Sequence, residues 1–498
     1  MTFGQARPRV TSVDVLGFAP SLRRCVALTP QSLCYVAASN PGGPDRVREA
    51  SIRAEVGLAV DARILIVARD DVRAGPLAEG LDRLGWRTIT ARGPYAALAA
   101  LGDLPIEAVI VDLASAGPET QTLARRLKAA IAPRRLPVIA IGEPDGDHRN
   151  QAFDLTLSPP LHPSQAALRL ETLVRTAIAE EEFELRLETF GERGRRLDLP
   201  EPPDTPARIL AVGEPAPQFL ALSNALQRSG AEVVGAFTAY TAFDYLHERP
   251  FDAVVLWAGD SQQEALSIAA GMRRNTRLFH IPALLYLKAE SYVTMSEAFH
   301  RGVSDVASPE TPEGETAMRV MELARSFRRG EAIRGALEKA RSSGLMDAAT
   351  GLFTRDLFAA HLARLARAAA ERSRPLSICV LRVADKPETV WARQNGWLDR
   401  AIPQIGSMVG RLVRVEDTPA RLATEVFALA LPATNQNAAR AAAERIAAVI
   451  GCTAFDAGED RPPFVCEFDI GVAEVQRGEG AVKALERAAA SALKRDAG

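Results

Sequence analysis

The sequence predicts an α/β chain in which two tandem, doubly wound domains precede a third domain of mixed α+β type. Its length of 498 residues corresponds to about three domains of ~150 residues each. Part of the sequence recurs 145 residues further along the chain, which indicates a duplicated domain. Within each copy, short and uniformly apolar runs alternate with amphipathic stretches, a pattern typical of a parallel sheet with helices on both faces.

The overall composition excludes several classes of protein. Hydrophobic residues make up 47% of the chain and charged residues 24%, which is typical of soluble globular proteins. The 60 Lys and Arg residues nearly balance the 62 Asp and Glu residues, so the chain lacks the positive charge with which general nucleic-acid binders neutralise phosphates. No apolar run reaches the ~18 residues of a membrane span, and the five cysteines include no CxxC pair that would indicate a zinc site. We therefore expect a cytoplasmic protein without a nucleic-acid partner, a membrane span or a bound metal.

The first 61 residues show no sustained periodicity. The turn-forming sequence SNPGGP at residues 39–44 indicates irregular backbone. We expect residues 1–61 to form a flexible N-terminal extension, and a start codon assigned too early would give the same pattern.

The repeat defines two domains of similar design. Residues 62–65, 107–112 and 136–138 correspond to residues 207–210, 252–257 and 281–283 at a constant offset of 145, and residues 158–159 correspond to residues 308–309 at an offset of 150. In the first copy, the apolar runs 64–67, 108–111 and 138–141 predict buried strands, and residues 76–84 predict a helix. We call residues 62–182 the first repeat domain and residues 207–330 the second repeat domain.

Two connecting segments and a final domain complete the expected organisation. Residues 183–206 are expected to be a linker, because a charged helix that starts near residue 178 is followed by the breaker-rich sequence PEPPDTP. Residues 331–346 belong to a stretch rich in Ala, Arg, Glu and Leu. They are expected to form a connecting helix, which either is a solvated connector or carries a signal or a dimer contact. Residues 347–498 mix strand signals with Ala-rich helices and form the predicted C-terminal domain.

Two motifs in the C-terminal domain carry a family resemblance. Residues 346–355 read MDAATGLFTR, and residues 421–427 read RLATEVF. The first resembles the D-x-(L/A)-T-G-L-x-x-R opening of GGDEF domains, the fold of diguanylate cyclases, and the second stands where their signature loop R-x-G-G-(D/E)-E-F belongs. The two repeat domains resemble response-regulator receiver domains. The resemblance implies two tandem CheY-like doubly wound receiver domains followed by a GGDEF (nucleotidyl-cyclase-like) domain. This order is that of PleD/PopA-like response regulators, and the altered signature is closest in character to the PopA type.

The resemblance also implies that cyclase chemistry is lost. The family holds two Mg²⁺ ions on carboxylates, which neutralise triphosphate charge and activate a 3′-hydroxyl. The position of its first metal-binding Asp is Arg382 and that of the companion acid is Ala384, and a guanidinium repels a cation. In the signature loop both glycines, which allow the backbone to approach phosphate closely, are replaced. The degenerate positions are Arg382, Ala423, Thr424, Glu425 and Val426. Only Glu425 among them retains an acidic side chain.

A second site of the family is retained. The resemblance implies a regulatory cyclic di-GMP site built from R-x-x-D shortly before the signature loop and an arginine on the following helix. Arg414, Asp417 and Arg445 occupy these positions. An arginine fork fits the O6/N7 edge of guanine or a pair of phosphate oxygens, and an Asp accepts hydrogen bonds from N1 and N2 of guanine. The alternative is an exposed Arg–Asp ion pair worth ~0–1 kcal/mol, because R-x-x-D also occurs by chance, as at residues 249–252.

Phosphorylation of the first repeat domain would depend on Asp112, which stands at the acceptor position of the receiver resemblance. Most of the helper groups are absent, because Gly142 holds the position of the Ser/Thr and Ser158 that of the Lys. Ala68 and Arg69 hold the positions of the Mg²⁺-binding acid pair, and Asp70 and Asp71 follow one or two residues too late. Asp112 is therefore a candidate phosphoacceptor, and the alternative is a strand-end carboxylate without a switching role.

The second repeat domain has lost the acceptor itself. Trp257 replaces the Asp, Leu287 the Ser/Thr and Ser308 the Lys, and only Glu214 is left of the acid pair. We expect Trp257 to pack this site shut and the domain to serve as a platform or dimerisation adaptor.

Together these features predict a catalytically inactive, cyclic di-GMP-binding effector of a two-component, cell-cycle signalling system. The resemblance implies cyclic di-GMP as the ligand, no cofactor, and protein partners of the polar or protease-adaptor kind, with localisation at the cell pole. Homodimerisation is a further expectation. Two alternatives stay open: a residual diguanylate cyclase that uses Glu425 to convert GTP to cyclic di-GMP, and a ligand-independent scaffold.

Overall fold

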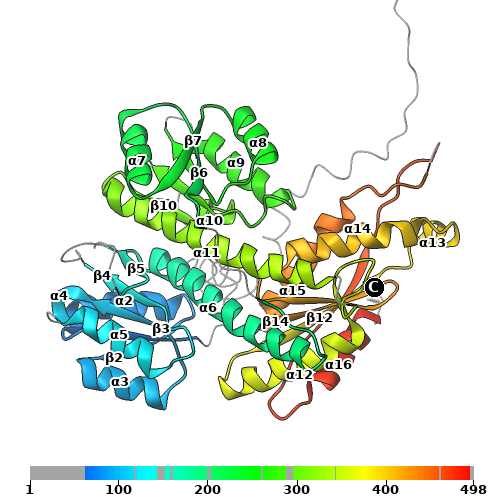
Figure 1. Cartoon of the computed structure of the whole chain (residues 1–498), viewed down its shortest axis with the longest axis horizontal. Helices are drawn as coiled ribbons and strands as arrows, with labels where there is room; N and C mark the ends of the chain where they lie inside the picture. Colours follow the sequence, from blue (N-terminus) through cyan, green and yellow to red (C-terminus); the bar gives the residue numbers. More distant parts are fainter. Residues whose placement is uncertain are drawn as a thin grey trace, which may run out of the picture. The chain divides into compact units, whose positions relative to one another are not determined.

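The computed structural model describes residues 62–116, 119–142, 152–157, 161–198, 204–259, 262–287, 295–341, 344–458 and 461–493. The expected N-terminal extension, residues 1–61, lies outside the described residues. The described part of the chain forms three five-stranded sheets (Figure 1). No helix among these residues combines the length and the apolar character needed to cross a membrane.

The first repeat domain is built on a parallel sheet with the strand order β2-β1-β3-β4-β5. Its strands are β1 (Arg63–Val67), β2 (Arg87–Ala91), β3 (Ile106–Asp112), β4 (Val138–Ile141) and β5 (Leu155–Leu157). Its helices are α2 (Asp71–Arg83), α3 (Pro94–Asp103), α4 (Leu113–Ala116), α5 (Thr120–Ala130) and α6 (Pro163–Gly191). Successive side chains of a strand point to opposite faces, so Ile64 and Ile66 pack with α2 and α6, whereas Leu65 and Val67 pack with α3 and α5. Helices cover both faces, which explains why β1 is apolar throughout.

The second repeat domain has the same plan, with the strand order β7-β6-β8-β9-β10. Its strands are β6 (Ala207–Val212), β7 (Ala231–Ala236), β8 (Ala253–Ala258), β9 (Ala283–Leu287) and β10 (Asp305–Ala307). Its helices are α7 (Pro217–Arg228), α8 (Ala239–Glu248), α9 (Gln262–Arg274), α10 (Met295–His300) and α11 (Glu313–Ala340). Helices α7 and α11 cover one face and α8 and α9 the other (Figure 1). The predicted pair of doubly wound domains is confirmed.

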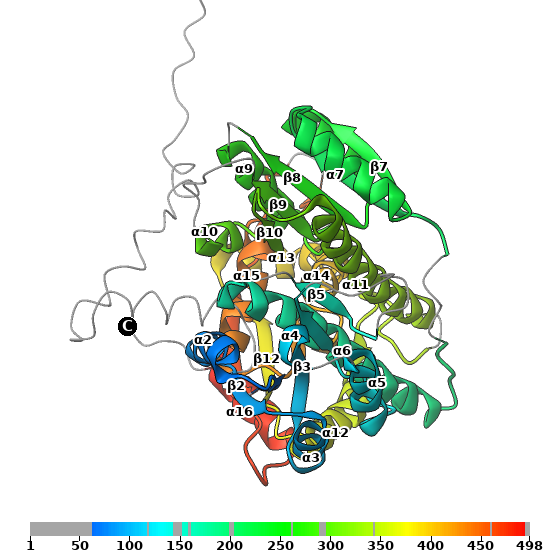
Figure 2. The ribbon, with the colours of Figure 1, turned by 90° about the vertical axis from the view of Figure 1, so that its left-hand side faces the viewer.

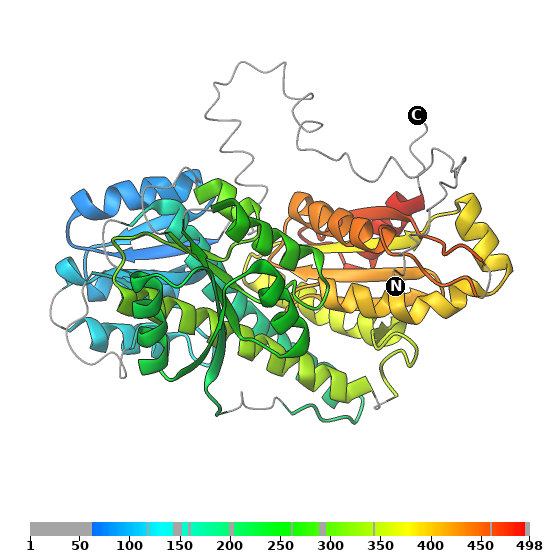
Figure 3. The same ribbon diagram turned by 90° about the horizontal axis from the view of Figure 1, so that it is seen from above.

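The C-terminal domain, drawn in yellow to red in Figure 3, has a mixed sheet with the order β11-β13-β14-β12-β15. Its strands are β11 (Phe353–Thr354), β12 (Leu376–Val383), β13 (Thr418–Ala423), β14 (Val426–Pro432) and β15 (Phe468–Glu474). Its helices are α12 (Arg355–Glu371), α13 (Pro387–Gln394), α14 (Trp397–Leu412), α15 (Gln436–Gly451) and α16 (Ala481–Leu493). Helices α14 and α15 cover one face, and α12 and α16 cover the other (Figure 1). Gly471 permits the close approach of α16 to β15, because a Cβ there would lie 1.8 Å from the main-chain oxygen of Ala488.

Helices α6 and α11 differ from the expected boundaries. Helix α6 continues without a break to Gly191, so the linker expected from residue 183 begins inside a helix. The charged stretch keeps a buried apolar face: Phe183 and Phe190 are buried, and the Phe190 ring lies edge-on to Phe353 of the C-terminal domain, with the centroids 5.8 Å apart. Helix α11 starts in the second repeat domain and ends at Ala340. Residues 331–340 of the expected connecting helix are therefore its C-terminal part, and residues 344–346 lie beyond its end.

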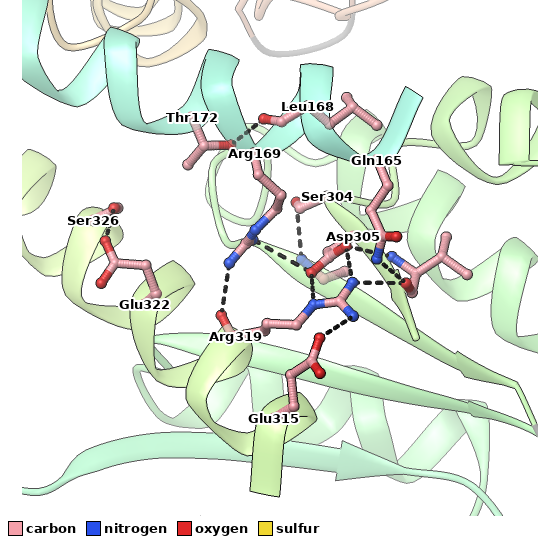
Figure 4. Close-up of polar contacts among 12 residues, drawn as sticks. Gln165, Leu168, Arg169, Thr172, Ser304, Asp305, Glu315, Arg319, Glu322 and Ser326 are labelled. Atoms are coloured by element: carbon pink, nitrogen blue, oxygen red, sulfur yellow. Dashed lines mark hydrogen bonds and ion pairs between the residues drawn. The ribbon is translucent and has the colours of Figure 1, made fainter. Parts of the chain in front are cut away.

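Helices α6 and α11 lie side by side (Figures 1 and 2) and enclose a buried ionic cluster (Figure 4). Arg169 of α6, Arg319 of α11 and Asp305 of β10 are each 1% exposed. Nε of Arg319 donates to Oδ2 of Asp305 at 2.9 Å, and Nη1 of Arg169 lies 3.5 Å from the same oxygen. Arg169 also donates to the main-chain carbonyl of Arg319 at 3.2 Å. The two arginines are 150 residues apart, an offset of the repeat, so equivalent helices of the two copies meet here.

Asp305→Ala should destabilise the chain strongly. The change leaves two buried guanidinium groups without their carboxylate, and removing one partner of a buried ion pair costs about 3–5 kcal/mol. Urea unfolding followed by circular dichroism measures the free energy of unfolding. The matched control is Asp244→Ala at an exposed position, where we expect a change within about 0.5 kcal/mol. A loss below about 1 kcal/mol for Asp305→Ala would contradict the importance of this cluster.

Candidate functional site

The three residues expected to bind a ligand lie at one corner of the C-terminal domain. Arg414 and Asp417 belong to the turn between α14 and β13, and Arg445 lies on α15. In this turn, Oδ2 of Asp417 accepts a hydrogen bond from the main-chain N–H of Arg414 at 2.9 Å. Asp417 is therefore buried and shapes the turn, whereas the guanidinium of Arg414 turns to another partner and its side chain stays 36% exposed.

The second oxygen of Asp417 is unpaired. Its Oδ1 is buried, and no described group donates a hydrogen bond to it. Burial, and then the neighbouring carboxylate of Glu416, raise the pKa of Asp417 to about 6. A buried acceptor without a donor carries a desolvation cost, so this oxygen is available to a donor that a ligand would bring.

Arg414 faces helix α6 of the first repeat domain. Its Nη2 lies 3.9 Å from Oε1 of Glu171. Glu171 is also 3.9 Å from Nε of Arg175, and Arg175 pairs with Glu416 at 3.3 Å. Burial raises the pKa of Glu171 to about 7, although Arg414 and Arg175 oppose the shift. The first residue of the R-x-x-D motif thus has a carboxyl partner from outside its own domain.

Arg414 also lines a cavity of about 270 Å³. Four further basic side chains line it, namely Arg175, His280, Arg329 and Arg334, together with two acidic ones, Glu331 and Glu416. The basic side chains come from α6, from α11 and from the second repeat domain. Arginines gathered around one small cavity suit an anionic ligand.

Arg445 completes the corner from α15. Its guanidinium lies over the ring of Phe279 in the second repeat domain, 5.0 Å from the centroid, which is a cation–π distance. Burial and the charge of Arg414 lower the pKa of Arg445, and Asp417 opposes this shift. The structure therefore places the three predicted residues within electrostatic reach of one another.

Helix α6 also holds the turn in place. Arg186 is 1% exposed, and its Nη2 donates to the main-chain carbonyls of Val415 and Asp417, both at 3.0 Å. Its Nε donates to Glu182 at 2.6 Å, and Glu182 lies 2.8 Å from Nε2 of His361 in α12. No motif pointed to Glu171, Arg175 or Arg186, because all three lie more than 200 residues before Arg414 in the sequence and only tertiary packing brings them there.

Ion pairs occupy the region where the resemblance places the signature loop. The positions Ala423, Thr424, Glu425 and Val426 span the turn between β13 and β14. Arg382, near the end of β12, lies 2.8 Å from Asp469 and 3.5 Å from Asp385. Glu425 accepts two hydrogen bonds from Arg393, at 2.7 and 2.6 Å. The carboxylates of this region are thus neutralised by guanidinium groups of the chain itself.

Asp112 stands at the end of β3, at the carboxyl edge of the first sheet. It is 8% exposed, and its Oδ1 accepts a hydrogen bond from the main-chain N–H of Ala114 at 3.2 Å. Ser158, at the expected Lys position, lies outside the described residues.

Trp257 occupies the corresponding edge of the second sheet, and here one expectation was wrong. The indole is 5% exposed and packs against Phe219 and Tyr286, with ring centroids 6.1 and 5.1 Å away. However, the site is not packed shut, since a cavity of about 260 Å³ remains beside the indole. The indole packs against Phe219 and Tyr286 and therefore does not fill this space.

Comparison with known proteins agrees with this architecture. Residues 344–496 match the family model "Diguanylate cyclase, GGDEF domain". The matched residues form the third of the three sheets and follow two doubly wound domains. The chain is 25% identical to the response regulator PleD of Caulobacter vibrioides, found in two strains, over 443 residues that cover 84% of this chain and 93% of PleD.

Solved GGDEF domains are similar to part of this chain. That of DgcB from Caulobacter crescentus, in complex with c-di-GMP, is 23% identical and covers 30% of this chain and 85% of that chain, with a TM-score of 0.28. The FimX GGDEF domain from Pseudomonas aeruginosa is 20% identical and covers 30% of this chain and 91% of that chain, with a TM-score of 0.27.

Glu171→Gln should flatten the pH dependence of stability. The folded-state pKa of Glu171, about 7, exceeds its ordinary value of 4.5, so the folded chain keeps a proton that the unfolded chain releases. The stability that this group contributes is complete below about pH 4.5 and is lost as the pH rises through about 7. Gln does not titrate, so between about pH 5 and pH 8 the variant should lose roughly 1–3 kcal/mol less than the wild type.

Urea unfolding at these two pH values measures the difference for Glu171→Gln. The exposed Glu248→Gln is the control and should keep the wild-type slope. Equal slopes for all three proteins would show that Glu171 titrates normally.

Proposed function

We propose that this protein is a catalytically inactive cyclic di-GMP effector that binds its ligand at Arg414, Asp417 and Arg445 and acts through protein partners. The observation that carries the proposal is the buried, unpaired Oδ1 of Asp417. It lies in the same turn as a partly exposed arginine and within electrostatic reach of a second one.

The chemistry of the ligand fits these groups. The N1–H and N2–H groups of guanine would supply the donors that Asp417 lacks, and the guanidinium groups of Arg414 and Arg445 would pair with phosphate oxygens. A phosphate and the carboxylate of Glu171 compete for the same guanidinium, since Nη2 of Arg414 already faces Glu171. Binding therefore requires Glu171 to move aside or to take up a proton, which its raised pKa favours.

The loss of catalysis is supported by the charges around β12. A guanidinium stands where the family's metal-binding carboxylate is expected, and Glu425 is held by Arg393 in a bidentate pair. Two Mg²⁺ ions would need oxygen ligands here, whereas Asp385 and Asp469 are both within 4 Å of the Arg382 guanidinium.

Two alternative functions would make different demands on these residues. A residual cyclase would have to free Glu425 from Arg393 and recruit further carboxylates. A ligand-independent scaffold is favoured by one observation, because Arg414 and Arg445 already have partners in the repeat domains, namely Glu171 and Phe279.

The wider setting follows from the similarity to PleD and is also proposed. We place the effector in two-component and cell-cycle signalling, with Asp112 as the candidate phosphoacceptor, homodimerisation, and protein partners of the polar or protease-adaptor kind at the cell pole. These assignments rest on analogy.

Calorimetric titration of the full chain with cyclic di-GMP tests the binding site. We expect saturable binding at micromolar concentrations, on the order of −8 kcal/mol. Arg414→Ala should weaken it at least about 100-fold, because it removes a charge-assisted pair. Arg382→Ala, at another arginine of the same domain, is the matched control and should bind as the wild type does. Loss of binding in Arg382→Ala but not in Arg414→Ala would move the site to the signature region, and no binding at all would favour the scaffold.

Incubation with GTP and Mg²⁺ tests the loss of catalysis independently. We expect no cyclic di-GMP above the level of a protein-free control, since the chain lacks the carboxylate at position 382 that its family would use for metal binding. Chromatography of the nucleotides measures the product. Sustained production that disappears in Glu425→Gln would establish the residual cyclase instead.

A further inference from the structure

The carboxyl edge of the second sheet holds a cavity of about 260 Å³ that has no part in the nucleotide site. The ends of β6 and β8, the turn before α8 and the first turns of α9 form it. In α/β folds, ligands bind at this edge, outside the carboxyl ends of parallel strands. All of its lining residues belong to the second repeat domain.

Trp257 gives this cavity a rigid wall. Its indole is fixed between Phe219 and Tyr286. Gly213 has a φ of +143°, and a Cβ there would lie 2.5 Å from Cβ of Trp257. A Cβ at Gly259 would lie 3.1 Å from the indole Nε1. Gly213 and Gly259, which follow the ends of β6 and β8, leave room for the indole. The packing around Trp257 therefore holds its ring in one position.

The lining combines apolar side chains with negative charge. Its apolar members include Val212, Leu256, Ile268 and Trp257. Phe237 also lines the cavity and is 60% exposed, which is unusual for a phenylalanine side chain. The charged members are Glu214 and Glu264, both exposed, and among the described residues of the lining there is no lysine or arginine.

We propose that this cavity binds a peptide segment of a partner protein in which an apolar or aromatic side chain is followed by a lysine or arginine. The apolar side chain enters the cavity and contacts Trp257 and Phe237. The cation then reaches Glu214 and Glu264, which have complementary charge.

Charge complementarity selects this occupant over others. A phosphate or an acidic segment would bring negative charge toward two glutamates, and no cation stands among the lining residues that the structure describes. An uncharged apolar segment would gain the burial but leave both carboxylates unused. The second repeat domain, whose acceptor position holds Trp257, would thus recognise a basic peptide at the edge where a receiver takes up a phosphoryl group.

The test uses the full-length chain and two synthetic peptides, acetyl-Gly-Phe-Arg-Gly-amide and acetyl-Gly-Phe-Glu-Gly-amide. The protein is labelled with ¹⁵N at its four tryptophans, and the indole signal of Trp257 is assigned with Trp257→Phe. We expect a saturable shift of this signal with the Arg peptide at millimolar concentrations. The Glu peptide should bind roughly tenfold more weakly. Its charge is repelled by Glu214 and Glu264 where that of the Arg peptide is attracted, and each exposed charge interaction changes the affinity a few-fold.

Two variants and a control complete the test. Glu214→Gln combined with Glu264→Gln keeps the cavity and should remove the preference for the Arg peptide. Ala239→Phe, at a half-buried lining position, should fill the mouth and abolish the shift. Glu248→Gln, an exposed charge outside the lining, should behave as the wild type does. The proposal is overturned by the absence of a shift up to about 10 mM peptide, by equal affinity for both peptides, or by a shift that survives Ala239→Phe.

Discussion

Charge compensation along one helix holds the described part of the chain together. Helix α6 buries Arg169, Arg175 and Arg186 within 18 residues. Arg169 pairs with Asp305 of the second repeat domain, and Arg175 pairs with Glu416 of the C-terminal domain. Arg186 pairs with Glu182 of its own helix and donates to the main-chain carbonyls of Val415 and Asp417. An unpaired buried guanidinium costs several kcal/mol. Neither neighbouring domain can therefore leave α6 without a large free-energy cost, and the same contacts hold the proposed ligand site in place.

The proposed ligand site consequently depends on more than the domain that carries its motif. The R-x-x-D turn supplies Arg414 and Asp417, but α6 supplies the carboxyl group that faces Arg414 and the arginine that holds the turn. A change in the position or protonation of α6 would alter the site directly. The region of the expected signature loop depends on its own domain alone. There Arg382 pairs with Asp469 and Arg393 pairs with Glu425, all within the C-terminal domain.

Much of the fold, but less of the site, was predictable from the sequence. The buried strands of the repeats are uniformly apolar because both faces of each sheet are covered. The constant offset of the repeat showed which strands of the two copies correspond. The end of α6 was missed because Phe183 and Phe190 lie among charged residues, so their burial depends on a distant domain. The roles of Glu171 and Arg186 depend on contacts across more than 200 residues, which leave no local pattern. The cavity beside Trp257 depends on the direction of one indole ring, which composition does not specify.

The pairing of α6 with α11 has a thermodynamic consequence of its own. Arg169 and Arg319 are equivalent positions of a duplicated unit, and their helices meet within one chain. Two separate copies would associate only above their dissociation constant, so their pairing would vanish on dilution. Covalent linkage replaces the bulk concentration by an effective local one, commonly in the millimolar range. The duplication thus turns a contact between copies into one that is insensitive to how much of the protein a cell makes.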